Sequence, residues 1–286
     1  MKLIRKLFVS LIVLIVIVGG VFFGGVLYIN KKYNIDTFKT ISSMKKMMTP
    51  VEESTLVTKP YSDSDMDDVL AGFDLSLDDD FITKDENGNY NIDTEKAHAT
   101  MKNEILLTDT QLAAFGNEIL HEKINDQIEF SNIIFPVKLL QLEFSDIQEK
   151  QTSISVVIRL DMTNFKTKFN GLILKIFKKY IPDFFYLTLP FDTVHGDTNF
   201  SYEITPKSLS INALSTEDSA SLFETIGKFV PFPTSDSFSN TFGQIFMDNL
   251  IGTEENPGIV YNMKKYGAKD YSFRSQDNKS YFVIEC

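Results

Sequence analysis

Residues 181–191, IPDFFYLTLPF, predict a β-strand that is apolar on both of its faces. Side chains alternate across a strand, so Phe185 and Leu187 point to one side while Phe184 and Tyr186 point to the other. Such a strand is either buried on both faces, or has one face in the core and the other lining an apolar pocket. The chain has 25 Phe and no Trp, and smooth aromatic walls suit acyl chains. Ordinary core packing on both faces is the favoured interpretation, and the aromatic composition supports a pocket as the alternative.

The segments before this strand predict an antiparallel sheet. Residues 137–144, VKLLQLEF, and residues 153–163, SISVVIRLDMT, are joined by the polar SDIQEKQ turn. The second run alternates between apolar and polar residues, which predicts one apolar and one wet face. Its apolar face carries Ile154, Val156, Ile158, Leu160 and Met162. Two hairpins are also predicted, at residues 81–92 around Asn87-Gly88 and at residues 271–286 with a turn at 276–279.

Several helices are interspersed with these strands. The clearest spans residues 106–126, where Thr108 as N-cap and Gln111 three residues later form a capping box. Further helices are predicted over residues 171–182, 215–230 and 237–252. Antiparallel strands combined with such helices predict an α+β fold.

Residues 7–29 form an apolar run that is interrupted only by Ser10. At about 1.5 Å per residue, a helix of this length exceeds the roughly 30 Å hydrocarbon core of a bilayer. No Cys follows the run, which excludes lipoprotein processing, and a signal peptide usually has a shorter apolar core with a small-residue cleavage site, for which Gly24 and Gly25 are the only candidates. We therefore predict an uncleaved signal anchor with a single span, and a cleaved signal peptide is the alternative. Gly20 and Gly24 form a GxxxG step, which is typical of close helix packing and suggests a homodimer, although glycine is common in membrane helices in general.

The charge of the chain favours a domain outside the cytoplasm. The first 46 residues hold eight basic residues and one acidic residue, which leaves 20 basic and 38 acidic residues beyond them, a net charge of −18. An acidic domain does not favour nucleic acid, because phosphate binding needs clusters of Lys and Arg. Basic residues flank both ends of the span, so their count alone does not set its orientation. The abundance of Lys, Asn, Ile and Phe suggests an AT-rich bacterial genome.

The chain divides into three predicted parts. Residues 1–30 are a basic cytoplasmic tip and transmembrane anchor, residues 31–80 are a basic stalk and acidic connector, and residues 81–286 are one extracytoplasmic α+β domain. The connector has clusters of Asp, but no register through residues 63–95 fits a calcium loop. With Gly88 in the sixth position, for example, Thr94 occupies the twelfth, where a Glu is required. We therefore expect a solvated connector and no metal site.

Catalytic motifs are missing, since the chain has no GxSxG, HExxH, P-loop, GxGxxG or CxxC. Three carboxylates lie near His195 in the sequence, namely Asp192, Asp197 and Glu203. The VHGD segment is better explained as a turn after the strand, with Gly196 at positive φ. The three His residues are isolated from one another, so no metal-ligand spacing exists. We predict a non-catalytic protein with no cofactor.

The order of these segments carries a family resemblance. The anchor, the helix LTDTQLAAFGNEIL, the long alternating strands, IPDFFYLTLPF and then SLSINALS resemble the YpmS-type family of single-pass bacterial membrane proteins. More distantly, they resemble the curved-sheet lipid-binding folds of tubular lipid-binding and AsmA-like proteins. The resemblance covers residues 100–250. It implies an extracytoplasmic α+β domain whose curved antiparallel sheet packs on helices and cradles lipid, and it carries over no catalytic residues.

Two functional hypotheses follow. In the first, an anchored cell-envelope protein binds a lipid or other apolar ligand without catalysis. The lining residues of that site would be Ile158, Leu160, Phe184, Phe185 and Tyr186. In the second, a membrane-tethered interaction or scaffolding module of an envelope complex docks a partner through exposed apolar helix faces. The docking residues would be Phe238, Phe242 and Phe246.

Overall fold

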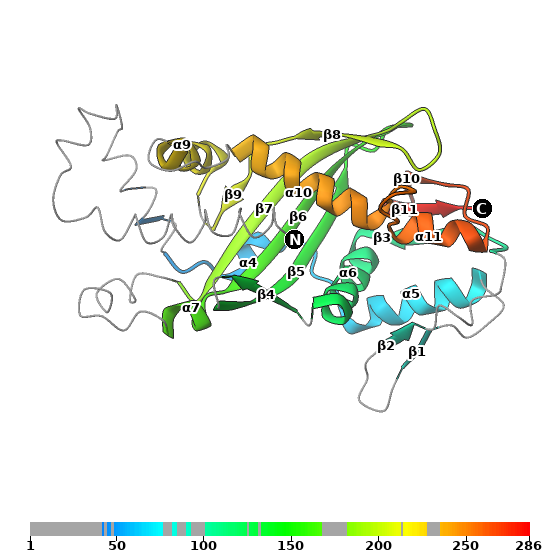
Figure 1. Ribbon diagram of the computed structural model, residues 1–286, viewed down its shortest axis with the longest axis horizontal. Helices are drawn as coiled ribbons and strands as arrows, with labels where there is room; N and C mark the ends of the chain where they lie inside the picture. Colours follow the sequence, from blue (N-terminus) through cyan, green and yellow to red (C-terminus); the bar gives the residue numbers. More distant parts are fainter. Residues whose placement is uncertain are drawn as a thin grey trace.

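The computed structural model describes residues 42, 45–46, 49–76, 82–84, 90–92, 101–124, 126–130, 133–167, 182–212, 214–227 and 235–286. Over these residues the chain has an α+β fold in which paired strands run antiparallel and helices pack on the sheets (Figure 1). The predicted fold class of antiparallel sheet and helices is confirmed.

The main sheet has six strands among the described residues. They are β4 (Gln127–Phe130), β5 (Ile133–Ser145), β6 (Gln151–Asp161), β7 (Phe184–His195), β8 (Tyr202–Pro206) and β9 (Ser210–Ile211). The order is β4-β5-β6-β7-β8, and β9 pairs with β7 beside β8. β6 alternates as predicted: Ile154, Val156 and Leu160 are buried, whereas Ser153 and Arg159 on the opposite face are half-buried.

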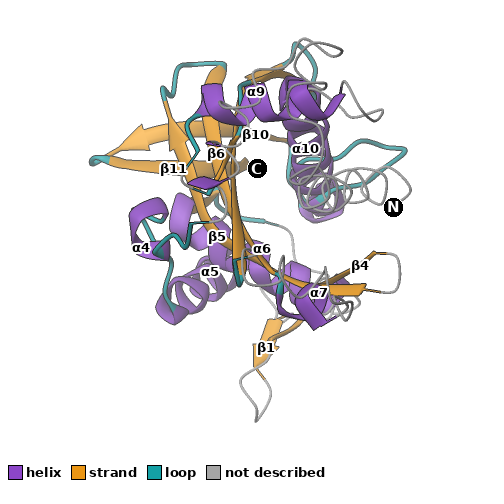
Figure 2. Cartoon of the chain, turned by 90° about the vertical axis from the view of Figure 1, so that its left-hand side faces the viewer, coloured by secondary structure: helices purple, strands orange, loops and turns teal. Residues whose placement is uncertain are grey.

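The strand predicted at residues 181–191 is β7, and both of its faces are covered. Phe191 points to α10 (Ser235–Leu250), where its ring packs edge-on against Phe246 with the ring centroids 5.9 Å apart. Tyr186, on the opposite face, is buried in a cluster with Val57, which follows α4 (Glu53–Leu56). Figure 2 shows α4 and α10 on opposite sides of these strands. β7 therefore packs with apolar side chains on two sides.

Part of the predicted connector belongs to the packed domain. After α4, residues 63–76 form α5 (Asp63–Ser76), whose Met66, Val69 and Phe73 lie in the main core. Phe73 packs against Phe115 with the ring centroids 5.9 Å apart. The acidic residues of this segment were the reason for expecting a connector, but Asp63 and its neighbours occupy the first turn of a helix, where the macrodipole favours negative charge. The packed part of the chain therefore begins before residue 81.

The helix predicted at 106–126 is α6 (Asp109–Ile124), and its capping box is present. The backbone N–H of Gln111 donates to Thr108 Oγ1 (3.2 Å), and the N–H of Thr108 donates to Gln111 Oε1 (2.8 Å). The helix begins later than predicted because the preceding residues form β3 (Ile105–Thr108), which pairs with β11 (Lys279–Glu285).

The C-terminal hairpin is confirmed. β10 (Asp270–Gln276) pairs with β11, giving a three-stranded sheet in the order β10-β11-β3 over the described chain. The turn residues Asp277 and Asn278 have φ values of 50° and 60°. Two consecutive positive φ angles are the signature of a two-residue type I′ turn, which matches the twist of paired strands.

The remaining helices are α7 (Thr163–Thr167), α9 (Thr216–Gly227), α10, α11 (Ile259–Met263) and the 3₁₀ turn η2 (Lys264–Tyr266). Ser215, the first residue of the helix predicted over 215–230, caps α9, because its Oγ accepts from the N–H of Asp218 (3.1 Å). α10 is followed by Gly252, which has a φ of 78° and lies against the backbone of Gly258. A side chain at residue 252 would overlap that backbone, so glycine is needed there.

The turn predicted after β7 is present, but the prediction that Gly196 takes a positive φ is wrong. β7 continues to His195, which pairs with Tyr202 of β8, and Gly196 does not have a positive φ. The left-handed residue of this loop is Phe200, with a φ of 61°. Its backbone N–H donates to Asp270 Oδ1 (2.9 Å), a residue 70 positions away. A tertiary contact thus holds the turn conformation where the local sequence favoured glycine.

Other predictions lie partly or wholly outside the described residues. The hairpin at 81–92 is present as β1 (Ile82–Lys84) paired with β2 (Tyr90–Ile92), whereas its Asn87-Gly88 turn is outside them. The span at 7–29 with Gly20 and Gly24, and the helix at 171–182, also lie outside. Among the residues that are described, no helix is long and apolar enough to cross a membrane.

Candidate functional site

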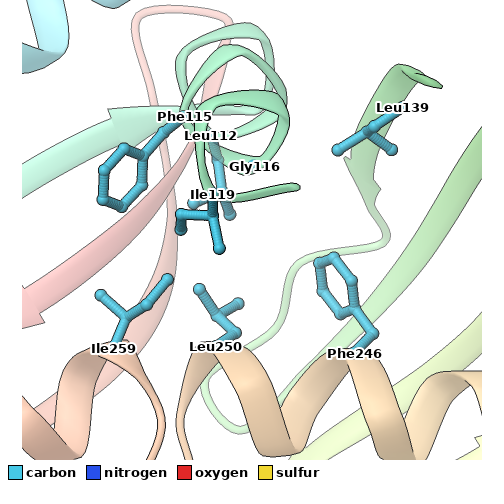
Figure 3. A pocket seen from close by; sticks show the side chains of 8 residues that line it. All are labelled: Leu112, Phe115, Gly116, Ile119, Leu139, Phe246, Leu250 and Ile259. Atoms are coloured by element: carbon cyan, nitrogen blue, oxygen red, sulfur yellow. The ribbon is translucent and has the colours of Figure 1, made fainter. Parts of the chain in front are cut away.

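An apolar cavity of about 70 Å³, which is partly open to solvent, lies between α6, β5, α10 and α11 (Figure 3). Its lining residues are Leu112, Phe115, Gly116, Ile119, Leu139, Phe246, Leu250 and Ile259, and none of them carries a polar side chain. Figure 3 shows Ile119 on α6 and Leu250 on α10 pointing toward one another across it. We call this site the α6–α10 cavity.

One wall of the cavity exists because α6 lies close against β5. A Cβ built on Gly116 would be 2.9 Å from Leu139 Cδ2, so only glycine allows this approach without displacing the leucine. The register of β5 against β6 shifts between Leu139 and Gln141, which marks a β-bulge. Asn117 binds the backbone at this bulge: its Oδ1 accepts from the N–H of Leu139 (3.1 Å), and its Nδ2 donates to the C=O of Leu139 (2.6 Å). Two residues therefore hold α6 against β5: Gly116 allows the close approach, and the Asn117 amide bonds to the backbone of Leu139.

The opposite wall is set by α10, which packs on β7 and β8. Gly243 faces Phe191 and Ile204, and Phe246 packs on the Phe191 ring one turn later. Because α6 packs against β5 and α10 packs against β7 and β8, the apolar faces of the two helices enclose a gap between them. This gap is the α6–α10 cavity.

The chemistry of the cavity is that of a hydrocarbon site. Water needs two to four polar partners to occupy a site stably, and the side chains of this lining offer none. A water-sized group needs about 10–15 Å³ of such space, so there is room for a few methylene groups. The cavity can therefore hold part of an alkyl chain by burial of apolar surface alone.

The five predicted lining residues are not gathered at this cavity. Leu160 and Phe185, 0% and 2% exposed, are buried on the same face of the sheet as Phe191. Ile158 is partly buried on that face and pairs with Leu139, which does line the cavity. Phe184 and Tyr186 lie on the other face of the sheet, where they pack with Val57. The structure therefore places these five residues on two faces of the sheet and does not bring them together in one lining.

The predicted docking residues are placed differently. Phe242 and Phe246 on α10 are partly buried and pack against the core, and Phe246 is a wall of the cavity. The side chain of Phe238 lies outside the described residues. Phe246 is therefore the one predicted site residue that the structure brings to the α6–α10 cavity.

The sequence identified the parts of the cavity without identifying the cavity. Helical spacing predicted one buried face with Leu112, Phe115 and Ile119 on the helix at 106–126. It also predicted the helix that carries Phe246 and Leu250, but Phe246 was expected to be exposed for docking. Gly116 and Leu139 were not singled out. Gly116 could have been found from its position in the middle of a predicted helix. Glycine there is unfavourable by about 1 kcal/mol relative to alanine, so it often has a packing reason.

His195 forms a carboxylate pair, but with Asp270 and not with its sequence neighbours. Its Nε2 is 3.0 Å from Asp270 Oδ1, and its Nδ1 is 2.7 Å from the carbonyl oxygen of Gly196. Asp270 Oδ1 also accepts from the N–H groups of Phe200 and Tyr271, at 2.9 Å each. Both ring nitrogens are engaged in these contacts, so the pair fastens the end of β7 to β10.

The neighbouring ionisable groups are also engaged. Asp192 pairs with Lys207 (2.6 Å), and Asp197 pairs with Lys150 (3.2 Å). Burial, together with the Asp270 carboxylate, raises the pKa of Tyr271 well above its ordinary value. Within the described part of the chain, no group of three or more His, Cys, Asp or Glu residues could hold a metal ion.

Comparison with known proteins gave no match to a family model, to a curated protein or to a solved structure. The resemblance to YpmS-type proteins therefore stays a prediction. The geometry of the α6–α10 cavity is the basis for the functional conclusion.

Proposed function

We propose that this chain is a membrane-anchored, non-catalytic protein of the bacterial cell envelope, and that its domain outside the cytoplasm binds an apolar ligand such as the hydrocarbon chain of a lipid. The observation that carries the proposal is the α6–α10 cavity, which is lined by eight residues without a polar side chain. A cavity of this kind favours hydrocarbon over water or a charged group.

The predicted anchor supports the same function. An apolar run over residues 7–29 would keep the domain beside a bilayer, where lipid chains are concentrated. The two helices that enclose the cavity face one another with apolar side chains, so they are suited to admit a chain between them. Because the lining is apolar, it favours an apolar chain that fits the cavity and does not recognise a headgroup.

Photo-crosslinking in membranes tests this proposal. The full-length chain is reconstituted in vesicles of phosphatidylethanolamine and phosphatidylglycerol that contain a phospholipid with a diazirine on one acyl chain. After photolysis, labelled peptides are mapped by mass spectrometry. Label on peptides of α6 and α10 is expected, together with label on residues 7–29 as the internal reference for contact with lipid. Label confined to residues 7–29 would contradict lipid binding by the domain.

A matched pair of variants locates the ligand. Ile119→Trp fills the cavity, whereas Leu120→Trp introduces the same side chain at a partly buried neighbour on α6 that does not line the cavity. We expect Ile119→Trp to lose most of the label on α10 and Leu120→Trp to retain it, with circular dichroism confirming that both variants fold. Equal labelling of the two variants would place the ligand elsewhere.

A further inference from the structure

We infer that residues 51–61 form a strap that couples the membrane-proximal part of the chain to the α6–α10 cavity, so that releasing the strap loosens the cavity wall. This inference deepens the proposed function and rests on it for the nature of the ligand. It is carried by a continuous set of contacts from the strap, through the β5 bulge, to residues that line the cavity.

The strap is fastened to the bulge by the buried side chain of Gln141. Gln141 is 3% exposed, and its Oε1 accepts from two backbone N–H groups of the strap, those of Thr58 (2.6 Å) and Lys59 (2.9 Å). A buried amide oxygen that loses both donors is left unsatisfied, which is unfavourable. The conformation of the bulge therefore depends on whether the strap is in place.

Three ion pairs and an apolar contact hold the strap along its length. Lys59 Nζ lies between Asp109 (3.1 Å) and Glu143 (3.0 Å), and Glu53 pairs with Arg159 (2.7 Å). Val57 is buried against the sheet between these anchors, in a cluster with Leu140, Val157 and Tyr186. The strap thus covers the face of the sheet opposite to α10.

The same bulge carries the cavity wall on its other side. Leu139 lines the cavity, and its backbone N–H and C=O are both bound by Asn117 of α6. The Asn117 amide also donates to the Tyr61 hydroxyl at the end of the strap (2.8 Å). Burial raises the pKa of Tyr61 to about 12, consistent with a hydroxyl held inside the structure. Strap and cavity wall therefore share two connections, one through Gln141 and one through Asn117.

Connected polar groups of this kind change together when one partner is removed. If the strap is pulled away, Gln141 and Asn117 each lose a partner, and the bulge and Leu139 are free to shift. The coupling is reciprocal, because a ligand that displaces Leu139 must disturb the same bonds. Strain on the membrane-proximal chain is expected to alter how the cavity holds its ligand.

Hydrogen exchange of the full-length chain in the same vesicles tests the coupling. Gln141→Leu keeps the volume but removes the acceptor of the strap, and Lys150→Ala, which breaks an exposed ion pair with Asp197, is the control. We expect Gln141→Leu to speed exchange about tenfold both in residues 51–61 and in α6, while the β10–β11 hairpin and the control stay unchanged. Faster exchange in residues 51–61 with α6 unchanged would overturn the inference.

Two further readouts keep the outcomes separate. If Gln141→Leu also speeds exchange in the β10–β11 hairpin, that variant has loosened the whole domain and does not test the coupling. Tyr61→Phe, which removes only one hydroxyl, is then the test. The inference requires α6 to exchange faster in Tyr61→Phe than in the native chain. Photo-crosslinking of Gln141→Leu is expected to change the label on α6 and α10 at least about threefold, with residues 7–29 unaffected. A native chain without label on α6 and α10 would reject lipid binding, while the exchange data would still decide the coupling.

Discussion

Gly243 of α10 lies directly on the ring of Phe191 in β7. A Cβ built on this glycine would be 3.1 Å from Phe191 Cγ and 3.2 Å from Ile204 Cγ2, which is tighter than ordinary side-chain contacts. The absence of a side chain brings α10 close to the sheet and lets Phe246, three residues later, reach both Phe191 and the α6–α10 cavity. One glycine thus sets the position of a cavity wall.

Replacing Gly243 with Ala is expected to destabilise the domain. Overpacking against Phe191 and Ile204 is unfavourable by about 1–3 kcal/mol, which outweighs the gain of about 1 kcal/mol in helix propensity. The control is Gly72→Ala on α5, where nothing lies within 4 Å of the added Cβ and a gain of up to about 1 kcal/mol is expected. Thermal unfolding measures both, and a Gly243→Ala variant as stable as Gly72→Ala would contradict the packing described above.

Asn117→Ala is expected to lower stability more than a typical polar substitution. It leaves the N–H and C=O of Leu139 without their partner at the bulge, at roughly 1–3 kcal/mol for each unsatisfied group where water does not replace it. Asn249→Ala is the matched control, because the Asn249 amide makes an exposed bond to the C=O of Ile245 one turn earlier on α10. The control should change stability by about 0.5 kcal/mol or less. Similar unfolding midpoints for the two variants would argue against a special role for Asn117.

The His121–Asp126 pair predicts a pH dependence with a defined sign. The hydrogen bond from His121 Nδ1 to Asp126 (2.7 Å) and the attraction between the two charges raise the pKa of His121 above its ordinary 6.5. Because the pKa is higher in the folded state, the stability from this pair is complete below about pH 6.5 and is lost as the pH rises through the folded-state pKa.

Titration of His121 by NMR measures this shift directly. Asp126→Asn removes the charge but keeps a side chain that tolerates the positive φ of 52° at this position. We expect the pKa of His121 in this variant to fall back toward 6.5. An unchanged His121 titration in Asp126→Asn would show that the pair does not set the pKa.

The capping box of α6 predicts a graded response at Thr108. Thr108→Ala removes the acceptor for the N–H of Gln111 and is expected to lose about 1 kcal/mol, whereas Thr108→Ser keeps the hydroxyl and most of the stability. Chemical denaturation of the two variants, with the native chain beside them, gives the difference. If Thr108→Ala and Thr108→Ser lower the free energy of unfolding equally, the effect comes from the pairing of β3 and not from the cap.

Local interactions were readable from the sequence because their partners are a few residues apart. The Thr108–Gln111 capping box, the cap at Ser215 and the turn of the β10–β11 hairpin each depend on a window of four residues or so. The alternation along β6 belongs to the same class, since a strand with one buried face must repeat every two residues.

The segment at residues 51–76 shows where local reasoning failed. Its acidic residues suggested a solvated connector, and the helical spacing of Met66, Val69 and Phe73, which are buried in the core, was not singled out. Charged residues indicate which face of a helix is exposed to solvent, but they do not indicate whether another element packs on the opposite face. The partner that covers α5 is α6, more than 30 residues further along the chain.

By itself, the sequence determined the α+β fold class, most of the strands of the described chain, and the helices α6, α9 and α10. The tertiary structure alone decided which apolar faces meet. Periodicity says that a face is buried, while the surface that buries it depends on distant residues, such as Leu139 opposite Gly116 and Phe191 opposite Gly243. The α6–α10 cavity arises from these two close approaches, so no local pattern in either helix could have located it.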